Sequence, residues 1–234
     1  MTTISKLYDS AYSSGNVSLS LGAGDLAVIC VHWTWNTSAS YLISSSTISV
    51  DGTDIGGVSY QLIADDSIRG DFMKIGTFLA PSAGSFNVSL NPTDTGTGRD
   101  VRLIVIKITP TASKKFNPSS YYVGSDTQPK ETSGTKTLTI PNNIGDILVG
   151  IAGALNPDGT LRIAWSAPAS EQTDLYVESY TEVTVATQVS ESANDAFVYV
   201  MGAEYYNAAV GVAVRESDLI NGVTAVFLSD YGVM

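Results

Sequence analysis

The chain has 234 residues, of which 44% are hydrophobic and 15% charged, and it carries a formal net charge of −11 at pH 7. So much apolar sequence excludes a disordered chain, and so acidic a surface disfavours nucleic acid and anionic membranes as partners. Cys30 is the single cysteine, which excludes an intrachain disulfide and therefore a disulfide-stapled secreted scaffold. The first residues lack the apolar stretch of a signal peptide, so we expect synthesis in the host cytoplasm.

Short runs with strand character follow one another along the first half, and helical periodicity is nearly absent. These runs cover residues 17–21, 25–35, 48–50, 58–63, 72–79, 86–90 and 101–108, with Gly-, Asn- and Asp-rich turns between them. The run at 86–90 alternates apolar and polar residues, as a half-buried strand does. The runs at 25–35 and 101–108 are apolar at most positions, which predicts strands covered on both faces. The pattern predicts an all-β sandwich or barrel.

The second half repeats the order of the first. GDLAVI at 24–29 matches GDILVG at 145–150, VSLSL at 17–21 matches TLTI at 137–140, FNVSL at 86–90 matches VGVAV at 210–214, and VRLIVIK at 101–107 matches VTAVFLS at 223–229. Single matches of this kind are weak, because alternating valines occur in any β protein. Four matches in one order predict two tandem antiparallel β-sandwich domains that arose by internal duplication.

We expect four segments along the chain. They are an N-terminal arm over 1–16, a first β-sandwich over 17–109, a linker rich in Pro, Ser, Thr and Lys over 110–135, and a second β-sandwich over 136–234. The first 115 residues hold eight Lys/Arg and nine Asp/Glu, whereas the rest hold four and fourteen. We therefore expect the nearly neutral first half to dock on a partner and the acidic second half to face solvent.

Each half combines a Ser/Thr-alternating strand, a turn that ends in Gly-Asp, a long apolar strand and a closing apolar strand. The pattern resembles the jelly-roll modules of bacteriophage virion proteins, which include capsid decoration (cement) proteins and tail-associated domains. The resemblance rests on Gly24-Asp25-Leu26, Gly145-Asp146-Ile147, Gly84-Ser85-Phe86 and the closing runs at 101–108 and 223–229. The Gly-Asp pairs themselves are interpreted as turn residues.

This resemblance implies a jelly-roll-like fold and a non-enzymatic structural role, most specifically in stabilising or decorating a phage head. It implies a location in the virion, contact with the major capsid protein or other virion proteins, and homo-oligomers, which are often trimers in that class. The alternative is a carbohydrate- or receptor-binding module of a phage tail or an adhesin.

Reactive side chains give no pattern that predicts an enzyme. Cys30 and His32 lie two apart on a predicted strand and so share a face, which makes a dyad conceivable. We prefer the interpretation of an interior thiol and a strand-end imidazole, since free cysteines are commonly buried. With a single His and a single Cys, a zinc site is not expected.

Acidic residues in turn-like segments are candidates for catalytic pairs or calcium ligands. Asp65-Asp66 and the Asp51/Asp54 pair could in principle serve glycoside hydrolysis, but they read as solvated turn acids. The loops at 51–57 and 94–100 carry oxygen ligands at short spacing without the EF-hand order. We therefore expect no cofactor and no metal, and a Ca²⁺ site in the second loop stays the weaker alternative.

Aromatic residues are the remaining candidates for contact with a partner or ligand. Trp33, Trp35 and Tyr41 gather at the end of the first long strand, and Tyr121 and Tyr122 lie in the predicted linker. Exposed aromatic side chains mark protein interfaces and sugar platforms. We predict contact through these five residues.

Overall fold

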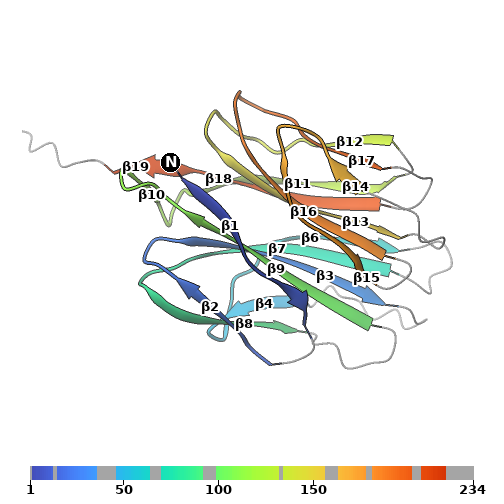
Figure 1. The fold of residues 1–234 in the computed structure, drawn as a ribbon, viewed down its shortest axis with the longest axis horizontal. Coiled ribbons are helices and arrows are strands. Elements are labelled where there is room, and N and C mark those ends of the chain that lie inside the picture. Colours follow the sequence, from blue (N-terminus) through green and yellow to red (C-terminus); the bar gives the residue numbers. More distant parts are fainter. Residues whose placement is uncertain are drawn as a thin grey trace, which may run out of the picture.

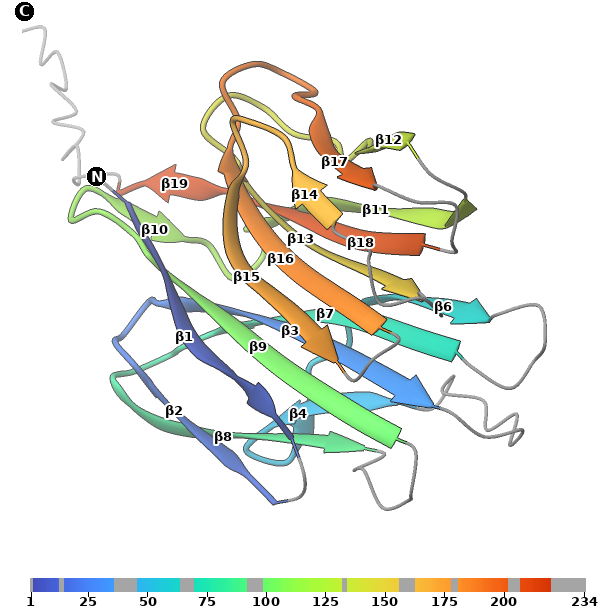
Figure 2. The same cartoon turned by 45° about the vertical axis from the view of Figure 1, so that its right-hand side comes forward.

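The computed structural model describes residues 2–12, 15–35, 46–63, 70–91, 99–131, 134–155, 163–177, 181–201 and 207–219. These residues are all-β: they form antiparallel sheets stacked in layers, and none of them is in a helix (Figures 1 and 2). The all-β sandwich class expected from the sequence is confirmed.

Among the described residues, the first half supplies nine strands and the second half ten. The first nine are β1 (Thr3–Ala11), β2 (Val17–Leu21), β3 (Leu26–Trp35), β4 (Thr47–Val50), β5 (Thr53–Asp54), β6 (Val58–Ile63), β7 (Gly70–Leu79), β8 (Gly84–Asn91) and β9 (Arg99–Thr109). The others are β10 (Lys114–Phe116), β11 (Tyr122–Glu131), β12 (Gly134–Leu138), β13 (Ile147–Leu155), β14 (Ile163–Trp165), β15 (Ser170–Val177), β16 (Thr181–Val189), β17 (Phe197–Met201), β18 (Asn207–Val214) and β19 (Glu216–Asp218).

Strand pairs in the first half are nested. β1 pairs with β9, β2 with β8, β3 with β7 and β4 with β5, all antiparallel. In a jelly roll, successive nested strand pairs belong alternately to two sheets that face each other. The first large sheet has the order β1-β9-β3-β7-β6, and the first small sheet has the order β2-β8-β4-β5.

The second half has the same strand order. Its second large sheet runs β11-β18-β13-β16-β15, and its second small sheet runs β12-β17-β14. The Gly-Asp turns before β3 and β13 also agree, because Gly24 and Gly145 have φ of 82° and 84°. Only glycine adopts this region freely, which explains why both turns carry it.

The later matches of the sequence repeat need correction. Residues 86–90 lie in β8, whose counterpart by strand order is β17, whereas residues 210–214 lie in β18, the counterpart of β9. The match between these two segments is therefore wrong by one strand, and residues 223–229 lie outside the described part. Alternating valines fit every strand of a β protein. The sequence match alone therefore could not show which of two neighbouring strands is the true counterpart.

The predicted arm and linker also take part in the sheets. β1 pairs along its whole length with β9, and β11 pairs with β18, so both are edge strands of the large sheets. Their sequences are polar and alternate only weakly between apolar and polar residues. An edge strand with such a sequence is therefore hard to recognise from the pattern alone. The domain boundaries themselves stay a prediction.

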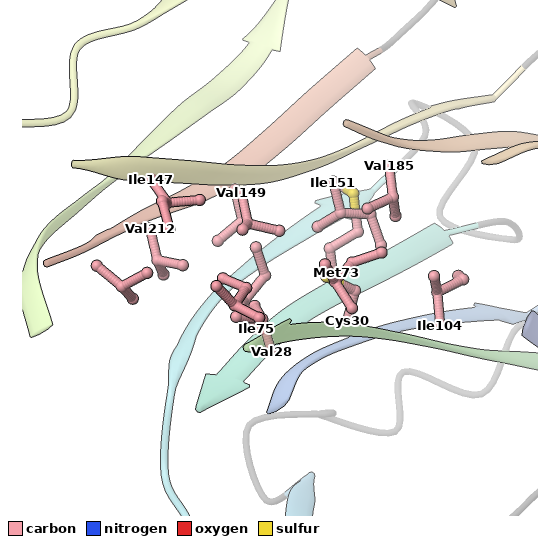
Figure 3. Close-up of a cluster of buried hydrophobic side chains, with 14 of the residues drawn as sticks. Val28, Cys30, Met73, Ile75, Ile104, Ile147, Val149, Ile151, Val185 and Val212 are labelled. Atoms are coloured by element: carbon pink, nitrogen blue, oxygen red, sulfur yellow. The ribbon is translucent and has the colours of Figure 1, made fainter. Parts of the chain in front are cut away.

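Three apolar cores hold the layers together. Two lie inside the sandwiches, around residues such as Leu19, Ile29 and Val88 in the first and Leu138 and Phe197 in the second. The third, the intersandwich core, lies between the two large sheets. Its main members are Val28, Cys30, Met73, Ile75 and Ile104 from the first half and Ile147, Val149, Ile151, Val185 and Val212 from the second (Figure 3). Ile106 belongs to the same core.

The intersandwich core explains the two largely apolar runs of the first half. Along β3, Ala27 and Ile29 face the first small sheet, while Val28 and Cys30 face the second sandwich. Since successive side chains on a strand point to opposite faces, a strand buried on both sides must be apolar throughout. The molecule is therefore a four-layer stack with the two large sheets at its centre (Figure 2).

A buried tyrosine fastens the crossing from the first large sheet to the first small sheet. Tyr12 follows β1, and its backbone N–H donates to the Val101 carbonyl at 2.7 Å. Its hydroxyl accepts from the Leu90 N–H at 3.2 Å and donates to the Gly15 carbonyl. One side chain thus links the connection between β1 and β2 to β8, as tyrosine corners do in other sandwiches.

We predict that the two sandwiches unfold together. Ile151→Ala, in the intersandwich core, should lower the free energy of unfolding by about 2–5 kcal/mol and shift a single calorimetric transition. The matched control Ile144→Ala, at a side chain 74% exposed, should change it by less than about 0.5 kcal/mol. Two separate transitions, of which Ile151→Ala moves only one, would contradict the shared core.

Tyr12→Phe should lower the free energy of unfolding by about 1–3 kcal/mol, because the buried Leu90 N–H loses its acceptor. Urea titration of both proteins measures the change. Tyr8→Phe serves as control, since the Tyr8 hydroxyl makes no hydrogen bond with the described residues. Equal effects of the two substitutions would refute the role of the Tyr12 hydroxyl.

Candidate functional site

The five predicted aromatic contacts separate in the structure. Trp33 is 3% exposed and stacks at a tilt on Phe72, with ring centroids 5.3 Å apart, in the core of the first sandwich. Its burial removes it from any surface contact, because β3 turns this face inward. Trp35 is the last residue of β3, and its side chain, like Tyr41, lies outside the described residues.

Tyr121 and Tyr122 line a pocket at the rim of the intersandwich core, which we call the seam pocket. Its volume is about 310 Å³, and its lining residues are Ile55, Gly57, Val58, Ile75, Thr77, Tyr121 and Tyr122. The first five come from the segment before β6, from β6 and from β7, on the first large sheet. Tyr121 comes from the connection between β10 and β11, and Tyr122 is the first residue of β11 on the second large sheet.

Tyr121 is fixed from three sides. Its hydroxyl lies 3.0 Å from the Thr77 hydroxyl, and its carbonyl accepts from the Arg215 N–H at 2.7 Å. Its ring meets Phe116 edge-on, with centroids 6.3 Å apart. These contacts join the connection to both large sheets, so the position of the ring is set by the packing of the two sandwiches.

The opposite wall depends on glycines. A Cβ on Gly57, whose φ is 128°, would lie 2.3 Å from the Ile75 carbonyl oxygen. A Cβ on Gly76 would lie 2.7 Å from the Cδ1 atom of Ile55. Glycine at both positions allows the loop before β6 to lie flat on β7, which forms the wall of the seam pocket.

Sequence reasoning found the two tyrosines of the pocket but missed its opposite wall. The loop at 51–57 carries oxygen ligands at a spacing that could suit Ca²⁺, and the structure gives its carboxylates other partners. Asp51 accepts from the Asn87 N–H at 2.8 Å, and Asp54 accepts from the Gly56 N–H at 2.8 Å. No group of three or more His, Cys, Asp or Glu residues that could hold a metal occurs among the described residues.

The Gly-Asp turns have the structural role expected from the sequence. Asp25 accepts from the Gly22 N–H, and Asp146 accepts from the Asn143 N–H, both at 2.7 Å. Asp146 also receives two hydrogen bonds from Arg215, each 2.7 Å long, and this pairing raises the pKa of the guanidinium. Both carboxylates thus complete turns, and one of them anchors the end of β18.

Cys30 and His32 do share one face of β3, but that face is the intersandwich core. Both side chains are fully buried, and burial raises the pKa of the Cys30 thiol far above neutrality. A thiol must ionise to act as a nucleophile, and here the charged form would lie in an apolar layer. The geometry gives this pair a packing role.

Cys30 should therefore resist alkylation in the folded protein. Iodoacetamide at pH 8 should modify it at least about a hundredfold more slowly than in urea, where the thiol regains its ordinary pKa. Mass spectrometry of timed samples measures both rates. Rapid modification with an unchanged far-UV spectrum would show that the thiol is reachable and that the core is described wrongly.

Comparison with protein-family models, with curated proteins and with solved structures finds no match for this chain. The described part of the chain has no helix that is both long enough and apolar enough to cross a membrane.

Proposed function

We propose that the chain is a non-enzymatic structural protein of a bacteriophage virion, most specifically a capsid decoration or cement protein. The intersandwich core is the observation that supports this most, because it joins two jelly rolls into one stiff four-layer body. A protein that stabilises a particle by contact needs a rigid shape and a complementary surface. Its partners would be the major capsid protein or other virion proteins.

The outer face of the first small sheet supports docking by the nearly neutral half. On β2 and β8 the outward side chains are small and uncharged: Ser18, Ser20, Ser85, Asn87 and Asn91 are all exposed. Covering such residues desolvates no charge and freezes few rotamers. This face can therefore meet a flat partner at low cost, while most of the net negative charge belongs to the other half.

Two edge strands of the large sheets, β1 and β11, favour contact through faces and loops. β1 has a bulge between Lys6 and Tyr8, and β11 has irregular register at Tyr122/Gly124 and at Gln128/Glu131. Bulges and charged residues on an edge strand oppose the addition of a further strand. Homo-oligomers, including the trimers implied by the resemblance, would then form through other surfaces.

Co-sedimentation with decoration-free capsids of the virus that encodes the chain tests this proposal. The wild-type protein should bind, and the double variant S20K/N87K should bind at least about tenfold more weakly, because it puts two charges on the proposed face. The matched control Thr135→Lys, on the second small sheet, should bind like wild type. Absence of wild-type binding would overturn the proposed function, and equal loss in both variants would overturn the choice of face.

A further inference from the structure

We propose that the seam pocket binds one neutral sugar ring of a glycan. The inference is independent of the structural role above, since the pocket lies at the junction of the sandwiches and not on the first small sheet. It rests on four properties of the lining residues: their charge, their apolar wall, their hydroxyl groups and their fixed positions.

The charge of the pocket selects a neutral ligand. No Asp, Glu, Lys, Arg or His is among the described lining residues, although the chain as a whole carries a net charge of −11. A phosphate, a sulfate or an acidic sugar would find no cation among them to balance its charge, and the surrounding negative potential would repel it. A cation would find no carboxylate among the lining residues.

The walls combine apolar and aromatic surface in the way a sugar ring requires. Ile55, Val58 and Ile75 offer aliphatic surface on one side, and Tyr122, which is 44% exposed, offers a phenol ring on the other. A pyranose has C–H groups that pack on such surfaces and hydroxyl groups around its edge. An amphipathic aromatic side chain at a half-open site suits both parts of that ligand.

Hydroxyl groups at the pocket would give orientation. The Tyr121 and Thr77 hydroxyls lie 3.0 Å apart and use one donor between them. Each hydroxyl has one donor and two acceptor positions, so this pair retains a donor and several lone pairs for the ligand. Sugar hydroxyls, which both donate and accept, match that set better than a purely apolar ring does.

The pocket is largely formed before any ligand arrives. Tyr121 is held by Thr77, Phe116 and the backbone of Arg215, and Gly57 is held against the backbone of Ile75. Binding to a preformed wall loses little conformational entropy. A volume of about 310 Å³ is at the small end of ligand pockets, which fits one ring with the rest of the glycan outside.

Saturation-transfer NMR and calorimetry with methyl glycosides of neutral hexoses and of N-acetylglucosamine test the proposal. At least one of them should bind the full chain, and methyl glucuronide should bind at least about tenfold more weakly. Tyr122→Ala should weaken binding at least about tenfold, Tyr122→Trp should retain it, and Tyr121→Phe should weaken it several-fold. Ile144→Ala, at an exposed side chain that does not line the pocket, should bind like wild type.

Thermal unfolding of each variant separates lost binding from lost folding, and Tyr122→Trp provides the independent check. No binding of any neutral glycoside, equal binding of the glucuronide, or unchanged binding in Tyr122→Ala would each overturn the proposal. Tighter binding of p-cresol than of any sugar, lost in Tyr122→Ala, would also overturn it and would assign the pocket to an aromatic side chain of a protein partner.

Discussion

The packing of the two large sheets against each other is the constraint on which the rest of the structure depends. Strands β3, β7 and β9 present Val28, Ile75 and Ile106 to the second sandwich. There these side chains pack against residues such as Val149 and Val212. If the halves were separate, this apolar layer would face water at a cost of about 25 cal/mol for each Å². Each half alone would therefore expose an apolar face.

Equal topology does not mean equal interiors. The inner face of β16 carries Glu182 and Thr184, which accept hydrogen bonds from the Ile163 N–H at 2.8 Å and from the Trp165 indole at 3.1 Å. At the corresponding depth the first sandwich packs apolar residues such as Phe72. The second sandwich thus orders its small sheet partly through buried polar contacts, which demand defined geometry. The two halves differ inside as well as in surface charge.

The seam pocket is a consequence of the same packing. Val58 and Tyr121 pack against the intersandwich core, and both line the pocket together with Ile75 of that core. Tyr121 is hydrogen-bonded to Thr77 of the first half and to Arg215 of the second half. Tyr122 is partly exposed at the mouth of the pocket. A site formed in this way needs both halves and the connection, so it would be absent from either half alone.

Local sequence determined the strand content, the Gly-Asp turns and the two strands covered on both faces, because each follows from periodicity or from the backbone freedom of glycine. Only the tertiary structure decided what covers those faces. An apolar strand requires a partner layer, but the pattern cannot say whether that layer is a helix, another chain or the other half. For the same reason Trp33 and Tyr121, both aromatic residues in strand-rich segments, look alike in the sequence. Their different burial depends on residues distant in the chain, on Phe72 in one case and on Thr77 and Arg215 in the other.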